Sequence, residues 1–594
     1  MEIMTKSGRS RGAAFNLEIG NISLALSGIH PPLKSCENEK RKVFVLGSPI
    51  YNDRIDYERV KEALLNKEVE EFIRDVNGSF LFLIYQKFDK TLTVANDRFA
   101  SMQFFYRMDG RRLFGATNYS DIWKRFRGTP GFRINEEAFY EFIYMRRIFG
   151  NKTYDRDTRF LDSASILKFK GNTGELKTDR YWRPNCDING LTENENAHKL
   201  AFLIEQSLKR VTSDEKRVGL LLSGGLDSRA IIAASDRPMS CFTTCEYRNN
   251  EVRVASELSR VKNYEHHFIE KPGNYYSDII DKAVYISGAM SIYVNAHLFN
   301  IEKAVRDKVD VLLSGYGFDF LFRGKYLPAT LPQRLKTLTY WRRLMRIGAS
   351  EKDVAEEFID NLSFRLKSVD PASILNVMSR KKMMDSLYHQ VKDITDEARG
   401  FSGDPYKWWD YCCFRNISRH YSWPNLLSIS CFMEERTVAL DNDLFDFFWS
   451  LDTASRHNGK IFKEVIKILD PAVFKVRYAN TNLSLGDPLF VTTAKIILNK
   501  VLKDTKLNRI FTKSVPPPSA KERSWPIDAD LVRDNTLIRS MASGLCDSGS
   551  LEALGFLNMD TVSSCVKEHL ERKKSHTNLI LSLITLDRFL KLGK

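Results

Sequence analysis

From about residue 194 to residue 314, short apolar runs of strand length alternate with segments that have helical apolar spacing. The predicted strands are Val218–Leu222, Met239–Thr244, His266–Ile269 and Val309–Leu313, and the predicted helices are Ala197–Val211, Ser228–Ala234, Glu251–Val261 and Tyr276–Ala289. Alternation of this kind predicts a parallel sheet with helices on its faces. Ligands of such sheets bind beyond the carboxyl ends of the strands, so that edge is the predicted place for a site.

A glycine-rich loop, Ser223-Gly-Gly-Leu-Asp-Ser228, joins the first of these strands to its helix. Glycines let the backbone approach a bulky anion, and a helix N-terminus offers free N–H donors and partial positive charge. Asp227 adds a hard oxygen suited to Mg²⁺. No Gly-Lys-Ser/Thr closes the loop, so it is not a Walker A loop. The alternative interpretation is a glycine-rich turn with an N-capping serine. The predicted nucleotide contacts are Leu222, Ser223, Gly224, Gly225, Asp227 and Ser228.

A second glycine-rich segment, Ser314-Gly-Tyr-Gly-Phe-Asp319, follows the strand predicted at Val309–Leu313. Asp319 meets the same chemical requirement as Asp227. Two carboxylates can share a Mg²⁺ that neutralises a triphosphate and the departing pyrophosphate. We therefore predict Asp227 and Asp319 as metal ligands and Gly315 as a nucleotide contact. Taken alone, Asp319 also fits a turn or a helix cap.

The chain predicts three regions. Residues 1–184 form a mixed α+β domain rich in antiparallel strand signals, and residues 194–490 form the parallel-sheet domain. A charged helical insertion at about 327–405, with a helix expected at Arg334–Arg346, interrupts the second domain. Residues 491–594 are expected to form a basic, helical C-terminal extension. More than one domain is expected in any case, because 594 residues exceed what one hydrophobic core usually supports.

Composition narrows the class of protein. Lys and Arg total 90 against 75 Asp and Glu, a formal net charge of +15, but the basic residues are scattered, which favours a solvated surface over nucleic-acid binding. The nine cysteines have neither zinc-site nor disulfide-framework spacing, which favours reduced thiols in an intracellular protein. No apolar run approaches the ~20 residues of a membrane span, and the N-terminus lacks the apolar core of a signal peptide. We expect a cytoplasmic protein without membrane or nucleic-acid partners.

The two loops carry a resemblance to a known family. Ser-Gly-Gly-Leu-Asp-Ser resembles the pyrophosphate loop of the ATP pyrophosphatases, and roughly residues 15–490 resemble the asparagine synthetase family. Gly47–Asn52, Asn77–Phe82 and Asn96–Phe99 resemble segments of the family's glutaminase domain. The resemblance implies an Ntn-type α+β domain followed by an α/β PP-loop synthetase domain. It also implies that the adenine lies against the second strand, near Thr243.

The resemblance implies an ATP- and Mg²⁺-dependent ligase. Such an enzyme activates a carboxylate as an acyl-adenylate, releases pyrophosphate and then AMP, and forms an amide with an amine or ammonia; the family-level activity is asparagine synthesis from aspartate. The implied partners are a small-molecule or peptide carboxylate and the amine or ammonia, with a homodimer as one form of assembly.

The chain departs from the family pattern in its glutaminase half and in its second loop. Active glutaminases of the family use an N-terminal cysteine, whereas the first cysteine here is Cys36, so the resemblance implies a domain that serves as a scaffold. The second loop carries Tyr316 and Phe320 where the family usually has glutamates. Tyr316 resembles the tyrosine of the β-lactam synthetases, and Glu434 aligns with a family glutamate. A Tyr316–Glu434 pair could act as general base, with Tyr316 as a plain lining residue the alternative.

A third departure concerns the cations. The family lysine that steadies charge on the adenylate is replaced by Ala479, which leaves Lys475 or Arg477 to reach the phosphates. Lys460 resembles another family lysine near the pyrophosphate. The predicted catalytic residues are therefore Tyr316, Glu434, Lys460 and Arg477.

Three alternatives to a plain amide ligase stay open. The altered second loop suits a cyclase of the β-lactam or lasso-peptide type. Ala479, Phe320 and the missing cysteine suit a degenerate protein that binds nucleotide as a scaffold. The net charge of +15 suits a tRNA-modifying PP-loop adenylase, although those enzymes lack a glutaminase-like half.

Overall fold

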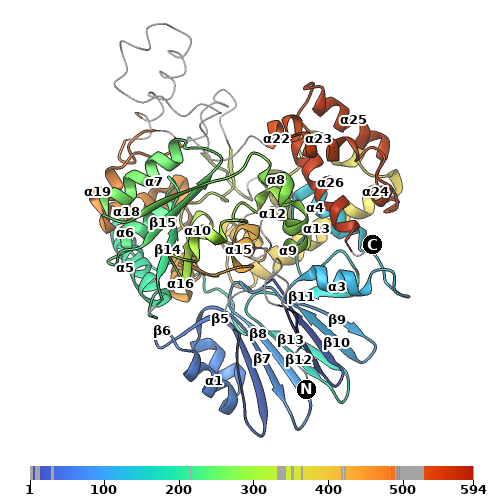
Figure 1. Cartoon of the computed structure of the whole chain (residues 1–594), viewed down its shortest axis with the longest axis horizontal. Coiled ribbons are helices and arrows are strands. Elements are labelled where there is room, and N and C mark those ends of the chain that lie inside the picture. The colour runs from blue at the N-terminus through green and yellow to red at the C-terminus, as the bar shows by residue number, and fades with distance from the viewer. Residues whose placement is uncertain are drawn as a thin grey trace.

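The computed structural model of the chain describes residues 4–6, 14–28, 33–214, 216–330, 343–348, 353–362, 365–416, 419, 423–480, 482–487, 491, 494 and 528–592. Two stacked sheets form the N-terminal half, drawn in blue and cyan in Figure 1. The first has the order β1-β2-β3-β10-β9-β11 and is antiparallel except for β3 beside β10. The second, β13-β12-β8-β7-β5-β4, is antiparallel throughout, with β6 paired to β5.

The bounds of the N-terminal strands and helices are β1 Met4–Lys6, β2 Ala14–Ile19, β3 Ile22–Leu26, β4 Lys34–Glu37, β5 Arg41–Tyr51, β6 Arg54–Ile55, α1 Tyr57–Asn66, α2 Val69–Phe72, β7 Asn77–Gln86, β8 Thr91–Asn96, β9 Phe105–Asp109, β10 Arg112–Ala116, α3 Tyr119–Phe126, α4 Glu136–Met145, β11 Thr158–Phe160, β12 Ser165–Lys170 and β13 Glu175–Arg180. Leucines such as Leu24 of β3 and Leu83 of β7 share one buried cluster between the sheets, while Val60 of α1 packs on Val43 and covers the other face of the second sheet. This alternation of faces is what a period of two residues in the strands produces.

The second half contains the predicted parallel sheet, with the strand order β16-β15-β14-β17-β20. Its strands are β14 Val218–Leu221, β15 Ser240–Cys245, β16 His266–Glu270, β17 Val311–Ser314 and β20 Glu434–Thr437. The chain builds outward from β14 through β15 to β16, then returns to add β17 and β20 on the other side. The strand order therefore reverses between β14 and β17, the position at which open α/β sheets bind ligands.

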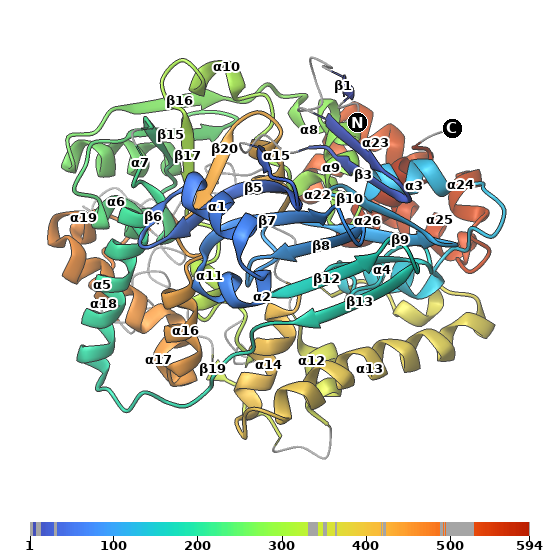
Figure 2. The ribbon, with the colours of Figure 1, turned by 90° about the horizontal axis from the view of Figure 1, so that it is seen from below.

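Helices cover this sheet, as Figure 2 shows. Those of the sheet region are α5 Glu193–Val211, α6 Asp227–Ala234, α7 Asn250–Val261, α8 Tyr275–Asp278, α9 Ile280–Ser287, α10 Glu302–Val305, α11 Phe318–Leu321, α15 Trp423–Ser430, α16 Asn442–Ser450, α17 Thr453–Arg456, α18 Lys460–Leu469 and α19 Pro471–Lys475. Helix α5 begins at a capping box, in which the Thr192 hydroxyl accepts from the Glu195 N–H at 3.3 Å and the Glu195 carboxylate accepts from the Thr192 N–H at 2.9 Å. The end of β13 and the start of α5 flank the predicted boundary between the first two regions.

The insertion and the C-terminal region are mainly helical, with α12 Val354–Asn361, α13 Val377–Arg399, α14 Pro405–Phe414, α22 Asp528–Asp534, α23 Thr536–Ser543, α24 Gly549–Glu552, α25 Met559–Leu570 and α26 Thr577–Leu590. The helix predicted at Arg334–Arg346 is wrong at its end, because β19 (Arg343–Leu344) pairs there with β18 (Ala329–Thr330); residues 334–342 lie outside the described part. In the described part of the chain, every helix is too short or too polar to cross a membrane.

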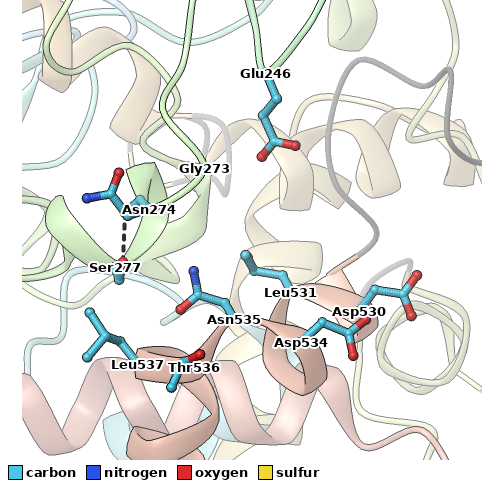
Figure 3. Close-up of a pocket in the computed structure, with 10 residues that line it drawn as sticks. All are labelled: Glu246, Gly273, Asn274, Ser277, Asp530, Leu531, Asp534, Asn535, Thr536 and Leu537. Atoms are coloured by element: carbon cyan, nitrogen blue, oxygen red, sulfur yellow. Dashed lines mark hydrogen bonds between the residues drawn. The ribbon is translucent and has the colours of Figure 1, made fainter.

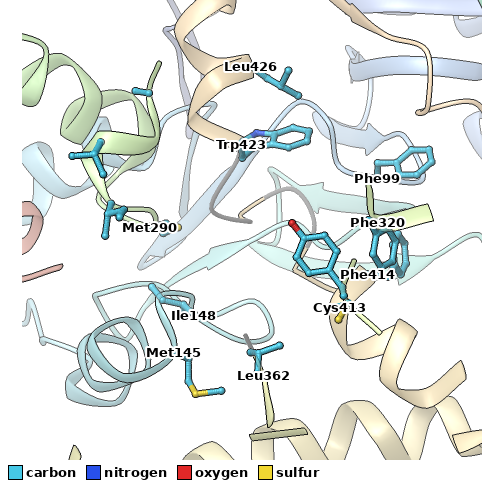
Figure 4. Close-up of a cluster of buried hydrophobic side chains, with 14 of the residues drawn as sticks. Phe99, Met145, Ile148, Met290, Phe320, Leu362, Cys413, Phe414, Trp423 and Leu426 are labelled. Carbon is cyan, nitrogen blue, oxygen red and sulfur yellow. The ribbon is translucent and has the colours of Figure 1, made fainter. Parts of the chain in front are cut away.

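One hydrophobic core runs through all of these regions. Figure 4 shows Phe99 and Ile148 of the N-terminal half beside Phe320 of the sheet domain and Leu362 of the insertion. Phe445 of α16 lies where they meet: its ring centre is 4.4 Å from that of Phe99, 4.9 Å from Phe414 and 5.2 Å from Trp182. Because these rings come from separate regions, the interface between the regions is packed like a domain interior.

Replacing Phe445 tests this shared core. We expect Phe445→Ala to destabilise the folded chain by about 3–5 kcal/mol, because it leaves a cavity among well-packed rings. Urea unfolding followed by tryptophan fluorescence measures the loss. The matched control is Phe88→Ala, since Phe88 is 99% exposed and its loss should change stability by less than about 0.5 kcal/mol. Equal midpoints for the two variants would contradict a core that is continuous across the regions.

Candidate functional site

A pocket of about 260 Å³ opens at the carboxyl ends of β14, β15 and β17. Its described lining residues are Leu221, Leu222, Ser223, Asp227, Ser228, Phe242, Thr243, Thr244, Glu251, His297, Leu298, Ser314, Gly315, Tyr316, Asp319, Asn425 and Leu426. Seven of the nucleotide and metal residues predicted from the two loops and the second strand are among them: Leu222, Ser223, Asp227, Ser228, Thr243, Gly315 and Asp319. Gly224 and Gly225, which were also predicted, are not.

Glycines allow the two loops to touch. A Cβ atom on Gly315 would lie 2.8 Å from the Asp227 carbonyl carbon and 2.8 Å from the Ser228 nitrogen, so a side chain there would push the loops apart. A Cβ on Gly224 would lie 2.3 Å from the Cβ of Ala479. Gly224 therefore serves the packing of the loop against the segment that contains Ala479, and this contact explains why it does not face the pocket.

Hydroxyl groups organise the first loop. The Ser228 hydroxyl accepts from the Ser223 N–H at 3.0 Å, and the Ser223 hydroxyl accepts from the Gly225 N–H at 3.2 Å. Ser228 lies in the first turn of α6, whose N-terminus faces the loop. This arrangement of a loop held by its own serines at the start of a helix is what an anion-binding site requires.

The two predicted metal ligands lie on the same wall of the pocket but not alone. Arg323 donates to Oδ2 of Asp227 at 2.6 Å, and the Lys325 ammonium lies 3.5 Å from Oδ2 of Asp319. Oδ1 of Asp227 is buried and has no hydrogen-bond partner among the described residues. Burial raises the pKa of Asp227 above its ordinary value, and the Arg323 guanidinium opposes that rise.

The other polar lining residues include a glutamate, a histidine and a threonine. Burial raises the pKa of Glu251 to about 7, and Lys271 and a backbone hydrogen bond from Gly224 oppose the rise. Burial lowers the pKa of His297 well below its ordinary value, so this ring is neutral at pH 7. Thr243 Oγ1 donates to the Leu222 carbonyl at 2.6 Å and lies 2.9 Å from Nε2 of His266. These contacts fix the side chain of Thr243, which lines the part of the pocket where a nucleotide base could lie.

Glu434 does not stand beside Tyr316, contrary to the predicted pair. In β20, Glu434 lies opposite Val311 at the start of β17, whereas Tyr316 follows the far end of that strand. Its carboxylate accepts from Ser48 at 2.6 Å, from Lys216 at 2.5 Å and from Arg436 at 2.6 Å. Although burial alone would raise the pKa of Glu434, Arg436 and Lys216 hold it below its ordinary value of 4.5. Glu434 therefore serves a buried ion-pair cluster that joins the two halves of the chain.

The predicted cations also lie away from the pocket. Lys460, at the start of α18, is 63% exposed and pairs with Glu193 at 2.5 Å. Arg477 is exposed, and its carbonyl accepts a 2.7 Å hydrogen bond from Arg229. The main chain of the next segment is what reaches the loop, since the Ala479 N–H donates to the Gly224 carbonyl at 3.3 Å. Neither Lys460 nor Arg477 is among the described residues that line the pocket. The segment after Arg477 approaches the first loop through its backbone and Ala479.

Two residues that the sequence did not single out contact the site. Arg323 bonds to Asp227, as described above. Glu435 follows Glu434 in β20, so its side chain points to the opposite face of the strand, where it accepts from the Ser314 hydroxyl at 2.5 Å and the Thr437 hydroxyl at 2.7 Å. Burial raises the pKa of Glu435 to about 7. Strand alternation across the Glu-Glu pair could have flagged Glu435 once β20 was known to be a strand.

A second, larger groove of about 500 Å³ separates the sheet domain from the C-terminal helices (Figure 3). Glu246 and the turn around Asn274 form one wall, and Leu531 and Asn535 of the C-terminal region form the other. The predicted C-terminal extension therefore lies against the sheet domain and forms one wall of this groove.

The N-terminal sheets do not place Cys36 as a nucleophile. It lies in β4, half-buried, with its thiol 3.9 Å from the Lys61 carbonyl, and burial raises its pKa. A reactive cysteine needs a lowered pKa and an exposed thiol. Cys36 has neither.

Replacing Glu434 by glutamine separates a structural from a catalytic role. We expect Glu434→Gln to cost about 3 kcal/mol of stability at pH 7, because Arg436 and Lys216 lose a buried counter-charge. The native pKa lies below 4.5, so the wild-type advantage is full above that value and disappears as pH falls through the native pKa. Urea unfolding at pH 7 and pH 3 measures both. Unchanged stability together with a lost product-forming step would restore Glu434 as the general base.

Comparison with known proteins agrees with this site. The family model of asparagine synthase matches residues 199–591, which is more than half of the chain. Asparagine synthetase (glutamine-hydrolysing) 2 of Bacillus subtilis is 24% identical over 286 residues, which cover 44% of this chain and 38% of that protein. Asparagine synthetase (glutamine-hydrolysing) 1 of the same organism is 22% identical over 261 residues, 43% of this chain and 41% of that one. The chain thus spans less than half the length of these two relatives.

A solved structure of glutamine phosphoribosylpyrophosphate amidotransferase from Bacillus subtilis, complexed with ADP and GMP, is 10% identical and covers 50% of this chain and 59% of its own. Its TM-score of 0.16 is too low to support an argument about the fold. The family match, by contrast, covers both loops of the pocket, the insertion and the C-terminal helices. The chain belongs to the asparagine synthase family.

Proposed function

We propose that the chain is an ATP-dependent ligase that joins a carboxylate to an amine or to ammonia. The observation that carries the proposal is the pocket at the switch between β14 and β17, into which both glycine-rich loops bring an aspartate. A carboxylate oxygen of the acid substrate would bond to the α-phosphorus of ATP as the bond to pyrophosphate breaks. The amine nitrogen would then bond to the acyl carbon, with AMP leaving and the amine giving up a proton.

The residues present fit Mg²⁺. Asp227 and Asp319 are hard oxygen donors on one wall, and Oδ1 of Asp227 is a buried acceptor left open among the described residues. No group of three or more His, Cys, Asp or Glu in the described chain could hold a metal by itself, so the remaining ligands would be phosphate oxygens and water. The ion would supply charge neutralisation for the phosphates.

The chain's own groups would position the nucleotide. Ser223 and Ser228 line the part of the pocket proposed for the phosphates, and Thr243 of β15 lines the part proposed for the base. Aspartate as the acid substrate, a cytoplasmic location and a homodimer are parts of the same proposal. The N-terminal sheets then serve as a scaffold, which the buried Ser48–Glu434 contact supports.

A second candidate is a nucleotide-binding scaffold without catalysis. The hydrogen bond from Arg323 to Asp227 favours this second candidate, because a cation is already bound to one of the two aspartates predicted to hold Mg²⁺. Ala479 favours it too, because no lysine stands at that position.

Exchange of labelled pyrophosphate into ATP tests both candidates. With a panel of carboxylic acids we expect wild-type exchange, and a loss of roughly 100-fold or more in Asp227→Asn and Asp319→Asn, since removing one charge-stabilising group costs this much in comparable sites. Asp310→Asn is the matched control, because Asp310 pairs with Arg217 at the opposite end of the same sheet. ATP binding without exchange for any acid would favour the scaffold.

The amine step has its own test. Tyr316 lines the pocket, with its ring edge-on to Trp423 at 5.2 Å, and the Ser314 hydroxyl links the pocket to Glu435. We expect Tyr316→Phe and Glu435→Gln to keep pyrophosphate exchange and lose product. Wild-type product formation should rise with pH through about 7, as Glu435 becomes able to accept a proton, and Glu435→Gln should lose that dependence. Undiminished product in Tyr316→Phe would leave Tyr316 as a lining residue.

A further inference from the structure

The pocket has an imbalance of charge. Its described lining residues include three carboxylates, those of Asp227, Glu251 and Asp319, but no Lys or Arg, and His297 is neutral. A triphosphate adds several negative charges to this set, more than one Mg²⁺ offsets. A nucleotide site of this composition needs a cation from just outside the lining.

Arg323 is a cation that the fold holds next to the pocket by a direct bond to a lining carboxylate. Lys271, the cation near Glu251, is buried, and burial lowers its pKa to about 7. Arg323 follows α11 in the same segment as Asp319, and its guanidinium donates to Asp227 at 2.6 Å with 19% of the side chain exposed. The backbone N–H of Arg323 donates to the Phe318 carbonyl at 3.1 Å. A Cβ on the next residue, Gly324, at φ +60°, would lie 2.5 Å from the Arg456 carbonyl oxygen, so the turn after Arg323 is tightly packed. Both ends of the residue are thus fixed.

The other cations are less suited to the role. Lys325 lies 3.5 Å from Asp319 but is 45% exposed, so water screens its charge. Lys463 of α18 is close enough to Arg323 for the two charges to interact. Among the interactions described, Lys463 contacts neither Asp227 nor Asp319. Lys460 and Arg477 lie outside the pocket, as shown above.

We propose that Arg323 contacts the phosphates of ATP and pyrophosphate, and that it exchanges its bond with Asp227 for phosphate oxygens when Mg²⁺ and nucleotide enter together. This inference rests on the proposed function. The guanidinium offsets the charge of Asp227 through Oδ2, and Oδ1 has no hydrogen-bond partner among the described residues. The planar fork of arginine suits two phosphate oxygens at once, and it supplies the positive charge that is absent at Ala479.

Calorimetric titration of the full chain with three probes tests the proposal. For Arg323→Met we expect Mg²⁺ with α,β-methylene-ATP to bind roughly 10- to 100-fold more weakly, the effect of losing hydrogen bonds to a charged group. Adenosine, which has no phosphate, should bind as in wild type. Mg²⁺ alone should bind as well or more tightly, because a competing cation has left Asp227. Arg323→Lys should fall between wild type and Arg323→Met, since it keeps the charge and loses the fork.

Arg217→Met is the matched control, because Arg217 forms a 2.9 Å pair with Asp310 at the far end of the same strands and should leave all three titrations unchanged. Arg323→Met that binds the Mg²⁺–nucleotide analogue as tightly as wild type overturns the proposal. So does a parallel loss of all three probes in both Arg323 variants, which would make the residue a structural support. A wild-type chain that binds no nucleotide analogue rejects the proposed function itself, a result distinct from either.

Discussion

The close approach of two backbone loops is the constraint on which the site depends. Gly315 passes so near Asp227 and Ser228 that no side chain fits between them, and Gly224 passes equally near Ala479. Each glycine removes the Cβ that would hold two chain segments apart, and the result is that aspartates from separate βα turns face one cavity. The parallel sheet supplies the geometry, because its strand order reverses between β14 and β17 and leaves a crevice there.

Charge explains much of what surrounds that crevice. Glu434, Lys216 and Arg436 form a buried cluster on one side of β20, where each ion is compensated by the others and by Ser48. On the other side of the strand, Glu435 is half-buried and accepts from two hydroxyl groups, with no cation among its described partners, and desolvation raises its pKa to about 7. The pKa values of Glu434 and Glu435 thus shift in opposite directions, because alternate side chains of a strand enter different environments.

Sequence patterns predicted the parallel sheet and the loops well, because strand–helix alternation and glycine-rich turns depend on local spacing. The helices predicted to end at Val211 and Val261 end there, as α5 and α7. The pattern did not reveal β20, since Glu434–Thr437 is four residues long and carries three charged side chains, of which Glu434 and Arg436 form ion pairs and Glu435 accepts hydrogen bonds from hydroxyl groups. Without β20, the Glu434–Glu435 pair could not be assigned to faces, and the wrong glutamate was placed in the site.

Cations were harder to place than carboxylates for a related reason. A lysine or arginine has a long side chain, so its position along the sequence says little about where its charge lies. Lys460 points to the surface from the start of α18, and Arg323 reaches Asp227 across two loops. Helix lengths and strand order are encoded locally, whereas the partners of charged side chains depend on segments that are hundreds of residues apart.

The placement of α26 has a consequence for the order in which the chain becomes compact. Phe589 packs at 4.6 Å from Trp123 and 5.4 Å from Tyr154, and Arg127 donates to a carbonyl 463 residues further along the chain. These aromatic rings of the N-terminal half emerge from the ribosome long before their cover. At roughly 5–20 residues per second, the 463 residues take roughly half a minute to a minute and a half. Through that interval the newly made first half exposes the apolar surface around Trp123 and Tyr154 that α26 later covers.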